Sequence, residues 1–209
     1  MAHYTKGRRK GRKKEKSWVI VAEGETEQAY FQKIIQNSRK YRSVVKTKPE
    51  LPNGHPCLDG IIAKAKRLIK EGYDLALVVF DKDVIMRNQE LLNEFKNIQN
   101  KYRAKDSKIK LFLSMPCFEV WLLLHYCYTS ADYLECDKLI AELKKYLPKY
   151  QKGHRYFIEK HMQELLELLP KARERAKMMR KEKKANDCGD DALSTDIDLL
   201  FDKLDTLTK

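Results

Sequence analysis

The stretch WVIVAEGETEQAYF, residues 18–31, decides the fold, because its apolar half ends abruptly in acidic residues. Residues 17–22 form a short run that is mostly apolar and rich in β-branched side chains, which is typical of a buried strand. Glu23, Glu25 and Glu27 follow at once, and apolar side chains then recur at helical spacing. The stretch therefore predicts a strand, a turn and a helix, with three carboxylates at the junction.

A second stretch, LALVVFDKDV at residues 75–84, repeats this arrangement. Residues 74–80 are apolar at nearly every position, as in a central parallel strand that is buried on both faces. Asp81 and Asp83 stand where that strand ends. Similar patterns predict strands at 42–49 and 108–113, and helices at 58–71 and 88–102. This alternation predicts an α/β fold with a mostly parallel sheet of about four strands flanked by helices.

The last part of the chain is predicted to contain helices only. Pro116 suits the first turn of an apolar helix. A long helical stretch covers 154–182, with a break expected at Pro170, and Ser194 or Thr195 is expected to cap the last helix. We therefore expect three parts: a disordered basic tail over 1–16, the α/β domain over 17–114, and an all-helical C-terminal extension over 115–209.

The net charge of +13 is concentrated in two segments. Residues 1–16 carry a net +7 and residues 171–184 a net +6, which together account for the whole excess. Clustered cations beside a neutral body favour binding to a polyanion such as nucleic acid. The alternative is a solubilising tail and a solvated helix face. No apolar run approaches the roughly 20 residues that span a bilayer, so we expect no membrane partner and a cytoplasmic protein.

The chain has five cysteines and no C-x-x-C pair. An odd number without such pairs favours reduced thiols and argues against a structural zinc site. Cys117 and Cys127 are expected to be small buried hydrophobic residues.

The acids after the two strands form the main candidate site. In a parallel sheet, the carboxyl ends of neighbouring strands meet at one edge, so Glu23 should lie near Asp81 and Asp83. Carboxylates that are held this close repel one another unless a cation lies between them, and oxygen ligands select Mg²⁺ or Mn²⁺. Gly24 would let the backbone approach a phosphate. For Glu27 taken alone, a helix-capping role is the simpler interpretation.

For several other candidate site residues, the sequence allows two interpretations. Glu119 lies in an otherwise apolar helix, so it either pairs with the dipole of the first turn or joins the metal site. His125 is interpreted as a core histidine, with a general-base role as the alternative. Lys82 either contacts phosphate or points away into solvent. Lys152 and Arg155 are either phosphate contacts or part of an amphipathic surface.

The motifs resemble a known family. VIVAEGETE followed by LVVFDKD is similar to a TOPRIM domain, which has Glu-Gly after one strand and Asp-x-Asp after a later one. EGETEQAYF (23–31), VFDKD (79–83), SMPCFEVWLLLHY (114–126) and LSTDIDLLFDKL (193–204) together resemble the RloB-like family over almost the whole chain. Members usually have Asn before the Pro of the third motif, where this chain has Met115.

The resemblance implies a metal-dependent enzyme that cuts or joins phosphodiesters. Glu23 would act as acid, base or metal ligand, Asp81 and Asp83 would hold metal, and Glu27 would be a second acid of the nuclease branches. The family accompanies restriction-modification and abortive-infection loci, often beside an ATPase, which implies anti-phage defence and a partner or homo-oligomer. The sequence contains no G-x-x-x-x-G-K loop of its own. A primase-like nucleotidyl transferase and a non-catalytic nucleic-acid-binding subunit are the alternatives.

Overall fold

A computed structural model describes residues 17–45, 50–51, 57–86, 88–131, 133–189 and 191–206. The predicted basic tail over 1–16 lies outside the described residues. Among the helices that are described, none combines the length and apolarity needed to cross a membrane.

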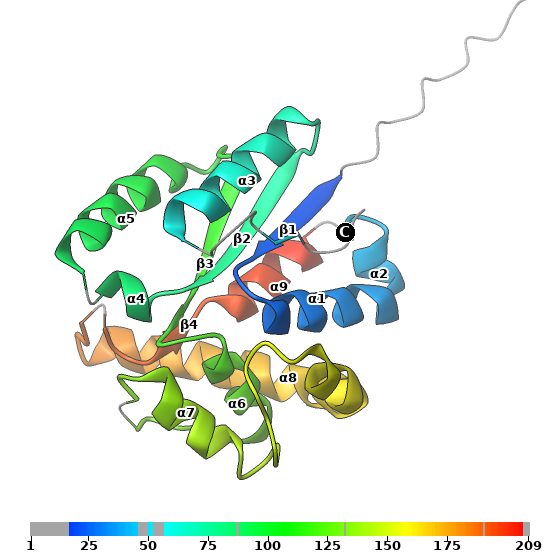
Figure 1. Ribbon diagram of the computed structural model, residues 1–209, viewed down its shortest axis with the longest axis vertical. Coiled ribbons are helices and arrows are strands. Elements are labelled where there is room, and N and C mark those ends of the chain that lie inside the picture. Colours follow the sequence, from blue (N-terminus) through cyan, green and yellow to red (C-terminus); the bar gives the residue numbers. More distant parts are fainter. Residues whose placement is uncertain are drawn as a thin grey trace, which may run out of the picture.

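The described sheet has four strands in the order β1-β2-β3-β4 (Figure 1). Strands β1 (Trp18–Ala22), β2 (Leu75–Asp81) and β3 (Ile109–Met115) are parallel, and β4 (Ser194–Thr195) is antiparallel to β3. The predicted α/β class with a mostly parallel sheet is confirmed. The expectation of helices only after Pro116 is wrong in this detail, because the chain returns to pair Ser194 with Met115.

The strand predicted at 42–49 is represented by two isolated bridges to β1. Val45 pairs with Trp18 and Glu50 with Val21, both in parallel, whereas 46–49 lie outside the described residues. Val45 and Glu50 therefore lie along the edge of β1 that faces away from β2.

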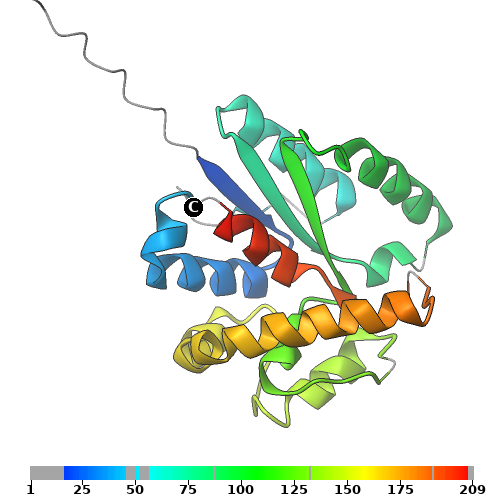
Figure 2. The ribbon, with the colours of Figure 1, turned by 180° about the vertical axis from the view of Figure 1, so that it is seen from behind.

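Helices cover both faces of the sheet and its carboxyl end (Figures 1 and 2). Helices α3 and α5 contact one face, α1 and α9 contact the other, and α6, α7 and α8 lie across the carboxyl ends of the strands. The helices are α1 (Glu25–Asn37), α2 (Arg39–Arg42), α3 (Leu58–Lys70), α4 (Asp83–Met86), α5 (Gln89–Tyr102), α6 (Glu119–Tyr126), α7 (Cys136–Leu143), α8 (Arg155–Ala185) and α9 (Ile197–Asp205).

The two faces follow from the alternation of side chains along a strand. Trp18 and Ile20 point into the larger core, which α1, α6, α8 and α9 complete, while Val19 and Val21 point into a smaller core under α3 and α5. Because every residue of β1 and β2 is buried, the near-continuous apolar runs in the sequence have a direct structural cause.

The helices differ from the sequence-based prediction at two prolines and at one N-cap. Helix α8 continues through Pro170, which the sequence predicted as a break, and it buries Leu165 and Ala172 on either side. Pro116 lies three residues before α6 instead of in its first turn, and follows Met115 through a cis peptide bond. Asp196, instead of Ser194 or Thr195, is the N-cap of α9.

Candidate metal centre

The strand register brings Glu23 and Asp81 together. Ala22, the last residue of β1, is paired with Val79 of β2, so Glu23 emerges beside the end of β2. One carboxylate oxygen of Glu23, Oε2, accepts a hydrogen bond of 2.7 Å from the backbone N–H of Asp81. The two acids that were expected to meet at the carboxyl edge of the sheet therefore lie in direct contact.

Glu27 lies in the first turn of α1 and is buried. Its Oε2 atom has no hydrogen-bond partner among the described residues. A Cβ atom on Gly24 would lie 2.9 Å from this oxygen, closer than real contacts allow. Gly24 has an extended backbone with φ −131°, so its role here is to leave room for the Glu27 carboxylate.

Glu119, the first residue of α6, is fully buried next to these acids. Its Oε1 atom accepts a hydrogen bond of 2.7 Å from the hydroxyl of Tyr150. Glu119 lies in the first turn of α6, as one of the two alternatives from the sequence has it, and its carboxylate also lies near the other acids.

Lys152 supplies the positive charge in this group. Its Nζ atom lies 2.8 Å from Oδ2 of Asp81 and 3.7 Å from Oε2 of Glu119. The other oxygen of Asp81, Oδ1, accepts a hydrogen bond of 2.8 Å from the backbone N–H of Phe118. The adjacent Gly153, at φ +81°, donates its N–H to Thr26 Oγ1 at 2.9 Å, which ties the lysine loop to α1. We call Glu23, Glu27, Asp81, Glu119 and Lys152 the acid site.

The carboxylic acids of this site have perturbed pKa values. Burial, reinforced by the neighbouring acids, raises the pKa of Glu23 and of Asp81, although Lys152 opposes both shifts. Burial and the nearby charge of Glu119 raise the pKa of Glu27 to about 7. Burial also opposes the charge of Lys152, but Asp81 and Glu119 outweigh it and raise the pKa of the lysine. The carboxyl groups of the site therefore hold their protons more strongly than free carboxyl groups do, because water does not solvate their charged form.

The donor set fits a hard divalent cation. It consists of carboxylate oxygens, which Mg²⁺ and Mn²⁺ prefer, and the unpartnered buried oxygen of Glu27 is one that a cation would satisfy. In the described part of the chain, the oxygens of no three of these acids lie within 4.8 Å of one another. The ammonium of Lys152 instead lies against Asp81 as the positive partner.

Two neighbours of Asp81 differ in their relation to the site. Asp83 begins α4 and lies close enough for its charge to raise the pKa of Glu23. Lys82 is buried, and its Nζ atom lies 5.8 Å from the centroid of the Phe95 ring. The expectation that Lys82 remains solvated is therefore wrong, because Lys82 is buried and lies against Phe95 in the middle of α5.

An apolar pocket opens beside the acid site. Its volume is about 120 Å³, and Glu23 and Asp81 form part of its wall. The remaining lining residues come from α3, α4, α5 and β2 and are Cys57, Leu58, Ile61, Phe80, Ile85 and Leu91. The pocket offers apolar surface next to the carboxylates.

The cysteines depart from the sequence-based expectation. Cys117 and Cys136 form a disulfide, with their Cα atoms 5.7 Å apart, whereas the odd number of cysteines predicted reduced thiols. The chain between α6 and α7 turns back and brings the start of α7 against the segment before α6. Sequence spacing gave no sign of this approach, since 19 positions separate the two cysteines.

Three further motif residues belong to the core. Met115 is buried at the end of β3, and Phe118, which has no side-chain cap bond, is the N-cap of α6, so Met115 does not cap that helix. His125 is fully buried, its Nε2 lies 3.1 Å from the Tyr30 hydroxyl, and burial lowers its pKa to about 4. It is a neutral core histidine, as the sequence indicated.

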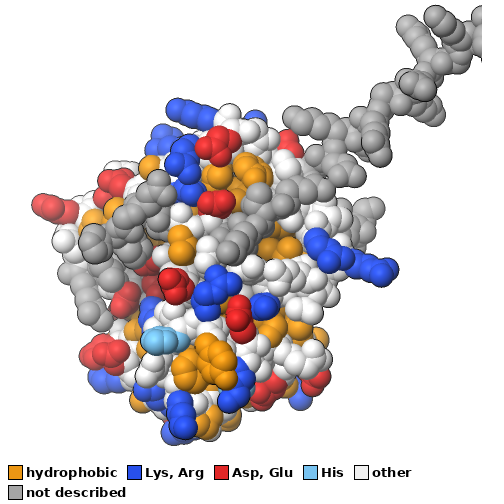
Figure 3. Space-filling view, turned by 45° about the vertical axis from the view of Figure 1, so that its right-hand side comes forward, with side chains coloured by type: hydrophobic (Ala, Val, Ile, Leu, Met, Phe, Trp, Pro, Cys, Tyr) orange, Lys and Arg blue, Asp and Glu red, His pale blue; other side chains and the backbone are white. Residues whose placement is uncertain are grey.

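The basic segment 171–184 is largely used within the fold. Arg173 binds Asp202 and Asp205 of α9. Arg175 donates to the backbone carbonyls of Leu124 and His125. Arg180 binds the fully buried Asp198. Arg155 likewise joins α8 to α1 by donating to Gln28 and Gln32. Blue and red side chains alternate over the face shown in Figure 3, without a continuous basic surface.

The family model described as RloB-like protein matches residues 18–204. No curated protein and no solved structure matches the chain.

Proposed function

The chain belongs to the RloB-like family, and from its acid site we propose that it is a metal-dependent nuclease that cleaves phosphodiester bonds of nucleic acid. The observation that carries the proposal is the buried carboxylate of Glu27, which keeps an unpartnered oxygen beside other desolvated acids. Such a group at the carboxyl edge of a parallel sheet is where this fold class binds ligands. An uncompensated buried carboxylate is costly unless a cation or proton neutralises it.

We propose that the bound cation is Mg²⁺ or Mn²⁺, which would activate a water and stabilise the leaving oxygen. The residues proposed to hold it are Glu23, Glu27, Asp81, Asp83 and Glu119. The backbone N–H groups of Asp81 and Phe118 fix the orientation of Glu23 and Asp81 for this role. Glu23 is also the candidate to accept a proton from the attacking water.

Lys152 is proposed to have a second task once a cation takes over Asp81. Its ammonium, at the end of a flexible side chain that is 44% exposed, can then turn toward a substrate phosphate. Gly24 and Lys82 were the other sequence candidates for phosphate contact. The Glu27 carboxylate lies against Gly24, and Lys82 is buried. Neither residue is therefore proposed to contact phosphate. Arg155 is occupied by α1, and is proposed to position the helix instead.

Family membership supports a wider proposal about setting. RloB-like proteins resemble effectors of anti-phage defence, so we propose that this protein acts in the cytoplasm in such a system, with an ATPase partner that controls it. Assembly into homo-oligomers is part of the same proposal.

The test is a cleavage assay on single-stranded and double-stranded DNA and RNA with Mg²⁺ or Mn²⁺. Wild type and Glu25→Gln should cleave, since Glu25 is exposed in the same turn, while Glu23→Gln and Asp81→Asn should lose cleavage. Cleavage that persists in Asp81→Asn, or that needs no metal, would contradict the proposal. Product formation only with nucleoside triphosphates would identify a nucleotidyl transferase. Binding without cleavage, even with the ATPase present, would identify a binding subunit.

A further inference from the structure

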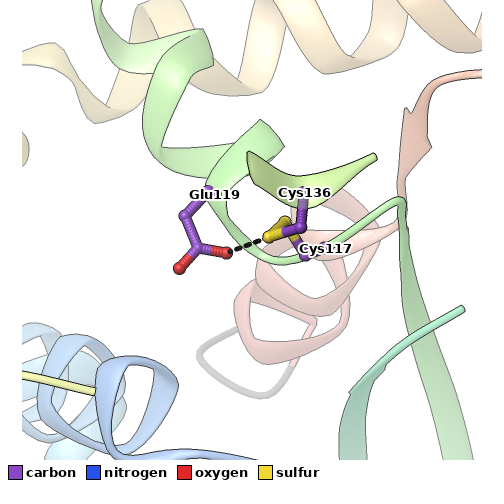
Figure 4. Close-up of side chains that lie close together, drawn as sticks. All are labelled: Cys117, Glu119 and Cys136. Atoms are coloured by element: carbon purple, nitrogen blue, oxygen red, sulfur yellow. Dashed lines mark hydrogen bonds between the residues drawn. A yellow bond between two sulfur atoms is a disulfide. The ribbon is translucent and has the colours of Figure 1, made fainter. Parts of the chain in front are cut away.

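Two cysteines and one glutamate converge beside the acid site (Figure 4). Cys117 precedes α6, Glu119 is its first residue, and Cys136 is the first residue of α7. One ligand atom from each, two sulfurs and a carboxylate oxygen, lie within 4.8 Å of one another. Among the described residues, this is the group of potential metal ligands that converges most closely.

The buried carboxylate lacks a good partner while the disulfide is closed. Oε2 of Glu119 lies 3.6 Å from Sγ of Cys136, and this contact is a hydrogen bond only if the sulfur carries a hydrogen. A disulfide sulfur carries none. The nearest cation is then Lys152, at 3.7 Å, which is closer to Asp81. Glu119 is fully buried, so while the disulfide is closed its Oε2 atom has no short hydrogen bond to any residue that the structure describes.

We propose that the reduced protein holds a soft divalent ion, with Zn²⁺ as the expected occupant, between Cys117, Glu119 and Cys136. Two thiolates and a carboxylate form a ligand set that zinc accepts, with a fourth position left for water. These ligands carry three negative charges, so a bound Zn²⁺ leaves a net −1. The ammonium of Lys152, 3.8 Å from Cys136 Sγ, offsets that charge.

The disulfide seen in the structure is the closed, metal-free form of this site. A dithiol reductant opens it: the reductant's two thiols become a disulfide, and Cys117 and Cys136 each gain one hydrogen. Zn²⁺ then replaces those two thiol hydrogens, which leave as protons. Cys136 is partly exposed, so both reductant and ion have access to the site.

This site differs in its chemistry from the proposed nuclease centre. It uses sulfur ligands that Mg²⁺ and Mn²⁺ avoid, and it depends on the redox state of the two cysteines. The two sites share Glu119 and lie on either side of Lys152. The sequence gives no C-x-x-C motif for this site, because one sulfur comes from the segment before α6 and the other from the start of α7.

The experiment uses Co²⁺ as a spectroscopic substitute for zinc. Full-length protein is reduced with dithiothreitol, freed of reductant under argon, and titrated with Co²⁺ while thiolate-to-cobalt charge-transfer absorption is recorded. Reduced wild type should show the band and lose it on addition of Zn²⁺, and unreduced protein should show none. Glu119→Gln should weaken Co²⁺ binding by at least about tenfold.

Three variants decide the outcome. Cys136→Ser should lose the band, and because this side chain is partly exposed it should keep the fold, as circular dichroism can check. Cys127→Ser is the matched control and should keep it. Asp81→Asn should also keep the cobalt band, because Asp81 is not a ligand of the zinc site. The cobalt assay can therefore succeed or fail independently of the proposed nuclease activity. Absence of the band in reduced wild type, or its persistence in Cys136→Ser, would overturn the proposal.

Discussion

The Nζ atom of Lys152 lies 2.8 Å from Oδ2 of Asp81, where the acid site would otherwise attract a free cation. The lysine comes from the loop before α8, and Asp81 from the end of β2. Lys152 and a divalent ion therefore compete for the same carboxylate.

Lys152→Met should bind Mn²⁺ more tightly than wild type and cleave more slowly. Removal of the ammonium relieves repulsion of the ion, and about tenfold is expected after allowance for the exposure of the lysine. Isothermal titration calorimetry measures the affinity. Lys149→Met, an exposed neighbour on the same loop, is the control. Weaker Mn²⁺ binding in Lys152→Met would show that the lysine does not compete with the ion.

Metal affinity should rise with pH up to about pH 7. Burial raises the pKa of Glu27 from 4.5 to about 7, so the folded protein holds a proton there that the ion must displace. Each such proton contributes up to about tenfold in affinity per pH unit.

The same pKa shift makes the metal-free protein lose stability as pH rises from 4.5 to about 7, after which the stability levels off. Mn²⁺ titrations and urea unfolding over this range test both effects, which Glu27→Gln should flatten.

Tyr150→Phe should destabilise the protein by about 1–2 kcal/mol. The hydroxyl of this buried tyrosine donates to Glu119 at 2.7 Å, and its loss leaves a buried acceptor unpaired. Urea denaturation gives the free energy of unfolding. Tyr156→Phe is the control, because that tyrosine is 67% exposed and should change stability by less than about 0.5 kcal/mol. Equal effects of the two variants would rule out a structural role for the Tyr150–Glu119 bond.

Asp198→Ala should destabilise the protein by about 1.5–3 kcal/mol, the range for a hydrogen bond to a charged group. Asp198 is fully buried in α9 and accepts from Arg180 of α8, whose side chain is 34% exposed, so water replaces the lost partner only in part. Thermal and urea unfolding give the size of the effect. Lys181→Ala, which removes an exposed charge from the same basic segment, should leave stability nearly unchanged. If both variants behave alike, the basic segment is a solvated surface and not a packing element.

The sequence predicted the sheet because buried parallel strands have a strong local signature. The runs at 18–22 and 75–80 are apolar throughout, which is typical of strands that are buried on both faces. The break at Pro170 was not observed, because the apolar face of α8 continues beyond it and its burial outweighs one missing backbone hydrogen bond. The strand at 194–195 is two residues long and carries too little pattern to be predicted.

Some residues of the candidate site could likewise be predicted from the sequence, whereas others could not. Glu23 and Asp81 could be named from the residue pattern, because they follow strands whose ends must meet at one edge of a parallel sheet. Glu27 was indicated only by the resemblance to the family, since taken alone it suited a helix-capping role. The sequence could not decide that Lys152 pairs with Asp81, that Tyr150 binds Glu119, or that Cys136 approaches Cys117. Those contacts join segments far apart in the chain, and only the packing of α6, α7 and α8 over the sheet edge fixes their distances.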